Sequence, residues 1–155
     1  MSELQVPELE ASLRDAIKEV LGTTLGGNPE FIPPDESIKG LSAIIEISGG
    51  MSGYLALHVT SEDACKVAET MLDCSYPDVD DIVCDATGEL ANMLGGSLKK
   101  FSGRYIEPFK ISVPKIVRGK DYETHAAKDT EQIFLYVRVA SVRFTMQLVV
   151  YTVPN

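Results

Sequence analysis

The segment CDATGELANMLGGSLKKF, residues 84–101, has the periodicity of an amphipathic helix. With about 100° of rotation per residue, its apolar side chains gather on one side together with the preceding valine: Val83, Leu90, Leu94, Leu98 and Phe101. The opposite side carries acidic, amide or small residues: Asp85, Glu89, Asn92 and Gly96. The acidic run at 78–81 favours a helix start before the segment, and Gly103 favours an end after it. The sequence therefore predicts a long helix with one buried and one exposed side.

The exposed side of this helix has two interpretations. Polar helix faces are usually just solvated, which would give Glu89 and Asn92 no special role. Two features favour function instead: asparagine is a poor residue in mid-helix, and the pair Gly95-Gly96 costs about 1 kcal/mol per glycine relative to alanine. A face that breaks local preferences is typical of a functional site. Glycines there would let the backbone of another protein come close.

The rest of the chain predicts an α+β fold. Apolar spacing predicts a helix over 7–25, and Ser61, as an N-cap, begins a short helix that ends near Leu72. The runs 41–48 and 54–59 predict a hairpin joined by GGMSG, and 108–117, 133–139 and 142–151 predict later strands. The element order indicates one domain, residues 1–155, in which long α-helices cover an antiparallel or mixed β-sheet.

Composition excludes several classes of function. The 155 residues contain 14 basic and 23 acidic ones, a formal net charge of -9, which argues against binding to nucleic acid or to an anionic membrane. The N-terminus lacks the features of a signal peptide, and no apolar run approaches a membrane span, so we expect a cytoplasmic protein. Three widely spaced cysteines predict no disulfide framework. Metalloprotease, P-loop and dinucleotide motifs are missing, and His58 and His125 are interpreted as structural or solvated.

The segment DATGELANMLGG resembles the D/S-x-x-x-E-x-x-N signature of the CheC/CheX/FliY phosphatases, with Asp85, Glu89 and Asn92 in its three positions. The stretch ISVPKIVRGKDY, residues 111–122, is similar to the segment that follows this helix in CheX members, with Pro114 as the family proline. The GGMSG hairpin also resembles CheX. The similarity covers nearly the whole chain, and the element order agrees with it.

The resemblance implies a CheC-like fold and a phosphatase that removes phosphate from the aspartyl-phosphate of a CheY-like response regulator, in chemotaxis or another two-component pathway. By the same resemblance, Asn92 orients the attacking water and Glu89 pairs with a lysine of the regulator. Asp85 and Gly96 are expected at the partner-binding surface. No cofactor or metal is expected on this chain, because Mg²⁺ would be held by the regulator. The resemblance also implies a homodimer, for which the late strands 135–150 offer an intersubunit sheet.

Two further observations bear on the function. The first helix has Asp15 and Glu19 at the same spacing, but Gly22 stands where the asparagine should be, so we expect one competent site per chain. The main alternative is a non-catalytic module of the same fold that docks receiver domains or belongs to a flagellar switch. A purely structural oligomer, built through sheet edges, is a third possibility.

Overall fold

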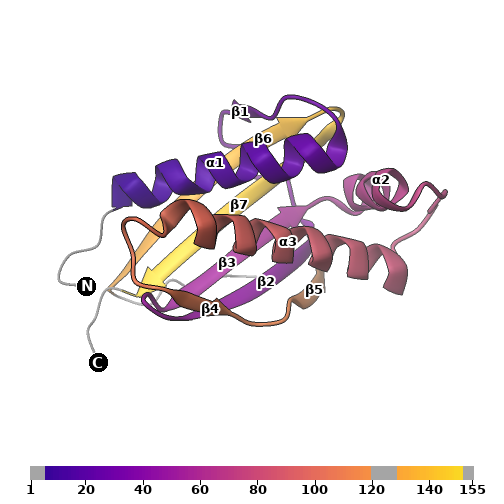
Figure 1. Ribbon diagram of the computed structural model, residues 1–155. Coiled ribbons are helices and arrows are strands. Elements are labelled where there is room, and N and C mark those ends of the chain that lie inside the picture. The colour runs from indigo at the N-terminus through magenta and orange to yellow at the C-terminus, as the bar shows by residue number, and fades with distance from the viewer. Residues whose placement is uncertain (1–5, 120–128, 152–155) are drawn as a thin grey trace.

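The computed structural model describes residues 6–119 and 129–151 (Figure 1). Seven strands form one antiparallel sheet in the order β1-β6-β7-β3-β2-β4. Strand β5 also pairs with β2, at residues 40–44, whereas β4 pairs with residues 47–49 of the same strand. The strands are β1 (Glu30–Ile32), β2 (Gly40–Gly49), β3 (Gly53–Val59), β4 (Phe109–Ile111), β5 (Lys115–Gly119), β6 (Thr130–Val139) and β7 (Val142–Tyr151). The predicted α+β class is confirmed, and the described sheet is antiparallel rather than mixed.

Two long helices, α1 (Val6–Leu25) and α3 (Asp81–Ser102), lie side by side across one face of the sheet, as Figure 1 shows. The buried positions of α1 recur at helical spacing and include Leu13, Ile17 and Leu21. Those of α3 include Leu90, Leu94 and Leu98, none of which is exposed. The core therefore lies between this helical layer and the inward side chains of the strands, which alternate with outward ones.

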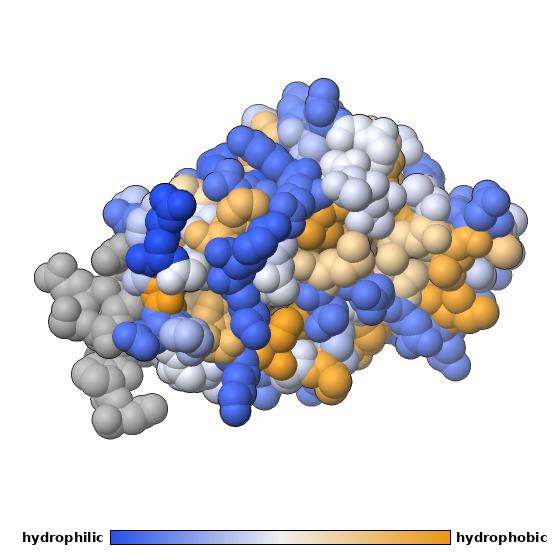
Figure 2. Space-filling model, viewed as in Figure 1, coloured by the Kyte–Doolittle hydropathy of each residue, from blue (hydrophilic) through white to orange (hydrophobic). Residues whose placement is uncertain are grey.

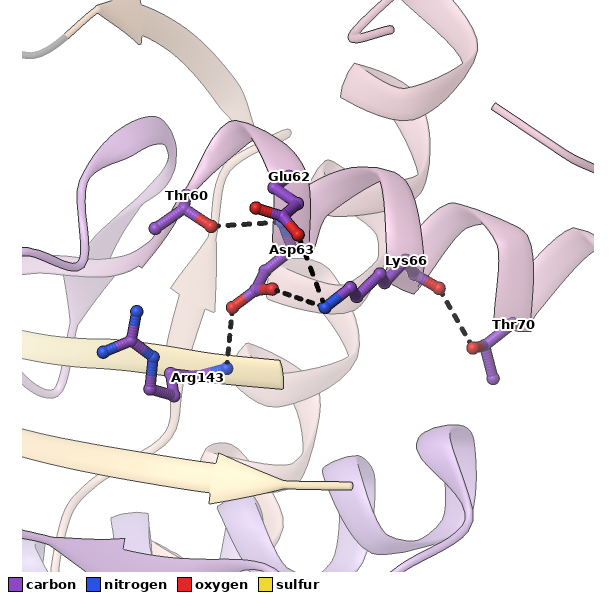
Figure 3. A network of polar contacts seen from close by, with 6 residues as sticks. All are labelled: Thr60, Glu62, Asp63, Lys66, Thr70 and Arg143. Carbon is purple, nitrogen blue, oxygen red and sulfur yellow. Dashed lines mark hydrogen bonds and ion pairs between the residues drawn. The ribbon is translucent and has the colours of Figure 1, made fainter. Parts of the chain in front are cut away.

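The short helix α2 spans Ser61–Leu72, so Ser61, which the sequence predicted as the N-cap, is instead the first helical residue. Its N-cap is Thr60, not Ser61, because the Thr60 hydroxyl accepts a hydrogen bond from the amide of Asp63 at 3.1 Å (Figure 3). Asp63 is buried, and its carboxylate accepts a hydrogen bond from the backbone amide of Arg143 at 3.1 Å. Lys66 approaches the same carboxylate at 3.6 Å. These contacts attach the start of α2 to the start of β7.

The strand predicted over 108–117 was wrong as a single element. The structure has β4 and β5 there, both paired with β2, and a bend at 112–114 between them. Ile47 pairs with Ile111 and Ile44 pairs with Lys115, so two residues of β2 face three residues of the bend. This extra residue is a β-bulge at the edge of the sheet. Its proline has no amide to donate to a ladder, which explains why pairing stops there.

The structure also bears on a short strand, on the glycine pair of α3 and on the two histidines. Strand β1 was not predicted, because it has three residues and exists through its pairing with β6. The Gly95-Gly96 pair neither ends nor interrupts α3. His58 has a structural position in β3: its Nδ1 lies 2.7 Å from the Ser42 hydroxyl and its Nε2 lies 2.9 Å from Oε1 of Gln147. His125 falls outside the described residues.

Within the described ranges, none of the helices combines the length and apolar character that a membrane crossing requires.

Candidate functional site: the exposed side of α3

Helix α3 begins and ends close to the residues that the sequence predicted as its limits. Asp80 is its N-cap, and its side chain accepts a hydrogen bond from the amide of Val83 at 2.9 Å. Gly103 follows the last residue, and Lys99 and Lys100 in the last turn complement the negative end of the helix dipole. The buried positions between these ends hold the helix against the sheet, so the direction of its outer side is determined.

The predicted site residues lie on that outer side. Asp85 and Glu89 are exposed, and Asn92 is half-buried. None of the three has a hydrogen bond or ion pair with another residue in 6–119 or 129–151. The prediction that they project from one helix face, opposite the buried leucines, is confirmed. The face is therefore a row of two carboxylates and an amide whose polar atoms are available to a second molecule.

The two neighbouring glycines have different surroundings. A β-carbon on Gly95 would lie 3.1 Å from Cδ1 of Ile111 and 3.5 Å from Cδ1 of Ile45, so this glycine allows α3 to pack closely on the sheet. A β-carbon on Gly96 would meet nothing within 4 Å. The sequence interpretation had assigned both glycines to the approach of a partner. It was wrong for Gly95, which faces inward, whereas Gly96 is exposed on the same side as Glu89.

The bend at 112–114 lies beside the site. A β-carbon on Gly88 would lie 3.4 Å from Cβ of Pro114, and Gly95 faces Ile111, so the bend runs along the helical turns between these two glycines. Asn92 and Glu89 belong to these turns. The edge of the sheet thus forms one border of the row of polar side chains.

The comparisons with known proteins agree with this architecture. The model of the family described as chemotaxis phosphatase CheX matches residues 41–138, which is more than half of the chain. The CheY-P phosphatase CheX of Thermotoga maritima is 32% identical over 121 residues, covering 75% of this chain and 76% of that protein. The chain belongs to the CheX family of chemotaxis phosphatases.

Solved structures show the same fold. The crystal structure of the chemotaxis protein CheX from Vibrio vulnificus matches with a TM-score of 0.80 at 18% identity, covering 91% of this chain and 95% of that one. A CheX–CheY–BeF₃–Mg²⁺ complex from Borrelia burgdorferi matches with a TM-score of 0.75 at 18% identity, covering 92% and 97%. At such identities the likeness concerns the fold, and the expected CheC-like fold is thereby confirmed.

The first helix of this CheX family member repeats part of the pattern but uses it differently. Glu19 accepts hydrogen bonds from Nζ of Lys100 at 2.6 and 2.7 Å and from the Ser97 hydroxyl at 3.0 Å. The hydrogen bond from Lys100, and after it that from Ser97, lowers the pKa of the Glu19 carboxyl below its ordinary value. Because Glu19 binds α3 in this way and Gly22 offers no side chain, α1 presents no counterpart of the Glu89–Asn92 pair.

Other chemistry-bearing groups near α3 do not add to the site. Cys84 is a buried free thiol, and burial, as the largest cause, raises its pKa, which disfavours the thiolate. Among the described residues, no three side chains of His, Cys, Asp or Glu converge as a metal site would require. Sequence reasoning missed three exposed apolar residues around the site, namely Ile82, Met93 and Val113. Ile82 and Met93 occupy polar-side positions on the helical wheel, which is the signal that could have found them.

Proposed function

We propose that this chain hydrolyses the aspartyl-phosphate of a CheY-like receiver domain, with Asn92 orienting the attacking water and Glu89 pairing with a lysine of the receiver. The observation that supports the proposal is the row on the outer side of α3, in which Asp85 and Glu89 are exposed and Asn92 is half-buried. None of the three has a partner among the described residues, and the chain belongs to a phosphatase family. The curated relative is a CheY-P phosphatase, and a fold neighbour was solved in complex with CheY. Both support a response regulator as substrate.

The reaction needs positioning more than covalent chemistry. Water attacks the phosphorus in line, and the bond from phosphorus to the aspartyl oxygen breaks. The products are the free aspartate carboxylate and inorganic phosphate. The protons of the attacking water stay on the phosphate or pass to the solvent, according to the pH of the solution. A carboxamide suits this step, since its Oδ1 accepts a hydrogen bond from the water while its Nδ2 can donate to an oxygen of the phosphoryl group. Asn92 does not need to change its protonation state to do so.

The other residues of the face have docking roles in this proposal. Glu89 supplies a carboxylate to a cation of the receiver, which fixes the register of the two proteins. Asp85 lies one turn before it and adds to the same acidic surface, and Gly96 leaves room for the backbone of the partner. Mg²⁺ neutralises charge at the phosphoryl group and is held by the receiver, so this chain needs no cofactor of its own. A chelator should stop the reaction by acting on the receiver.

The test is phosphate release from candidate receivers of the same organism, phosphorylated with a small acyl phosphate. Single-turnover decay at saturating amounts of this protein should be much faster than spontaneous hydrolysis for at least one receiver. If the protein binds receivers but accelerates none, the alternative of a non-catalytic docking or flagellar-switch module replaces the enzyme. The choice between chemotaxis and another two-component pathway follows from which receiver responds. A cytoplasmic location is part of this proposal, because receivers of this type act there.

We also propose a homodimer, and the fold narrows the choice of interface. Strand β7 lies between β6 and β3 and cannot supply an edge, although the sequence had offered it for an intersubunit sheet. Strand β1 pairs with residues 136–138 of β6, so among the described residues no strand covers the same edge at 131–135. This edge is open to strand pairing with a second copy. Light scattering that gives only the 16.9 kDa monomer at high concentration would refute the dimer without affecting the phosphatase.

A further inference from the structure

The bend at 112–114 exposes an apolar side chain to an unusual extent. Val113 is 85% exposed, the highest value among the exposed large apolar residues in 6–119 and 129–151. Exposure of an apolar valine side chain to water is unfavourable, and valine is typical of half-buried strands, whereas Gly, Asn, Asp and Ser are the usual residues of solvent-exposed turns. The position of this side chain therefore calls for an explanation outside the folding of the chain itself.

The bend is held rigidly. The Ser112 amide donates a hydrogen bond to the carbonyl of Glu46 at 2.9 Å, and the Ser112 hydroxyl accepts one from the amide of Glu46 at 2.9 Å. The same hydroxyl donates to the carbonyl of Val113 at 3.0 Å. On the other side of Val113, Pro114 packs where Gly88 leaves room on α3. An exposed side chain on so constrained a backbone loses little conformational entropy when a partner covers it.

Val113 borders one side of the polar row, and Met93 borders the other. Gly88 and Gly95 mark the side of α3 that faces the bend, and Asn92 lies only about 40° around the helix from Gly88 at 100° per residue. Asp85 and Glu89 follow at about 60° and 100°, and Ile82 and Met93 at about 120° and 140°. Met93 is 36% exposed and Ile82 is 48% exposed. The carboxylates and the amide thus lie between two apolar borders.

The surface view agrees with this arrangement. Figure 2 shows polar and apolar areas side by side on the face that carries α1 and α3, with apolar surface near the start of α3 and again along the lower edge, where β4 and β5 lie. The exposed positions of α3 from Asp81 to Gly96 include three carboxylates and no basic residue. The surface is acidic in its middle and apolar at its borders.

We propose that Val113 and Met93 are the apolar contacts through which the receiver domain docks, one on each side of the Asn92–Glu89 row. The inference rests on the proposed function and adds residues that fix affinity rather than rate. A receiver fits this surface because the region around its phosphorylated aspartate offers a lysine and bound Mg²⁺ to the carboxylates. Apolar contacts that enclose such a polar centre exclude water and strengthen the interactions inside it.

The experiment is single-turnover dephosphorylation of the responding receiver over a range of concentrations of this protein. For Val113→Asp, we expect the half-saturating concentration to rise about tenfold or more, as loss of one apolar contact and burial of a charge predict. The plateau rate should stay the same. Val113→Ala should show a smaller increase, and Met93→Asp an increase similar to that of Val113→Asp. The control is Tyr151→Asp, because Tyr151 is 49% exposed at the end of the internal strand β7 and follows the core residue Val150, so its side chain points to the face of the sheet opposite the helices. No change is expected for this variant.

The outcomes separate this inference from the proposed function. Because the Val113 side chain is 85% exposed, we expect its substitution to leave the fold intact, and equal thermal unfolding midpoints of the parent and the variants will verify this. If the parent protein is active and the half-saturating concentration of Val113→Asp equals that of the parent, the docking role is refuted while the phosphatase stands. A fall in plateau rate without a change in half-saturation would also refute it. If the parent protein neither binds nor dephosphorylates any receiver, the proposed function fails first, and the docking surface fails with it.

Discussion

Helices α1 and α3 lie next to each other on the same face of the sheet and carry acidic residues at the same spacing, yet their acidic residues have opposite surroundings. In α1, Glu19 is bound by Lys100 and Ser97, both of which belong to α3. In α3, Glu89 has no partner among the described residues, and Asn92 stands where α1 has Gly22. The comparison shows that a motif spacing marks a candidate site, whereas the availability of its polar groups distinguishes a site from a structural contact.

The amide of Asn92 is the largest functional difference between the two helices. Asn92→Ala should lower the plateau rate of dephosphorylation by about 10²–10³, the usual loss when one positioned catalytic group is removed. Binding to a receiver carrying a stable phosphate mimic should change little, because most of the interface remains. The measurement is single-turnover decay together with a binding titration. A variant that hydrolyses as fast as the parent would show that Asn92 is not the catalytic residue.

The two glutamates give the second contrast. Glu89→Gln should weaken receiver binding at least tenfold and slow turnover at subsaturating concentrations, since it removes one partner of an intermolecular charge pair. Glu19→Gln is the matched control on α1 and should leave both quantities unchanged. Receiver titrations at two ionic strengths measure the effect, and the advantage of the parent over Glu89→Gln should shrink at high salt. Equal effects of the two substitutions would contradict the distinction between the helices.

The two glycines of α3 sharpen the comparison within one helix. Gly96→Ala should raise the free energy of unfolding by up to about 1 kcal/mol, since alanine favours helix and the added methyl group meets no neighbour. The same substitution should weaken receiver binding. Gly95→Ala gains the same propensity but places its methyl group 3.1 Å from Ile111, so its stability should stay below that of Gly96→Ala. Denaturant unfolding and receiver titration of both variants test this pairing. A Gly96→Ala protein that is more stable and binds equally well would remove Gly96 from the interface.

Much of the fold and of the candidate site could be predicted from local sequence patterns. The features that could not be predicted depend on contacts between residues far apart in the sequence. The spacing of Leu90, Leu94 and Leu98 was enough to orient α3, because a helix buries whichever side is apolar. The bulge at 112–114 was not predictable, since it depends on Ser112 bonding to Glu46, 66 positions away in the sequence. The separate roles of Gly95 and Gly96 likewise depend on where Ile111 lies. The exposure of Val113 follows from that bulge and was missed with it.

Removal of the ion pair between Glu19 of α1 and Lys100 of α3 should have the smallest of these effects, a small change in thermal stability. Glu19 and Lys100 are both largely exposed, so their contribution to stability is modest and screened by salt. The sign follows from the pKa of Glu19, which is lowered in the folded state by its hydrogen bonds to Lys100 and Ser97. The stabilisation is thus present above the ordinary glutamate pKa of about 4.3 and is lost as the pH falls below it. Glu19→Gln should lower the thermal unfolding midpoint slightly at neutral pH, and the difference from the parent should disappear in acid. Glu89→Gln is the control on α3 and should not lower the midpoint at either pH, because no described residue pairs with Glu89. If the two substitutions reduce the midpoint equally, Glu89 has a structural partner, and its proposed availability to the receiver is wrong.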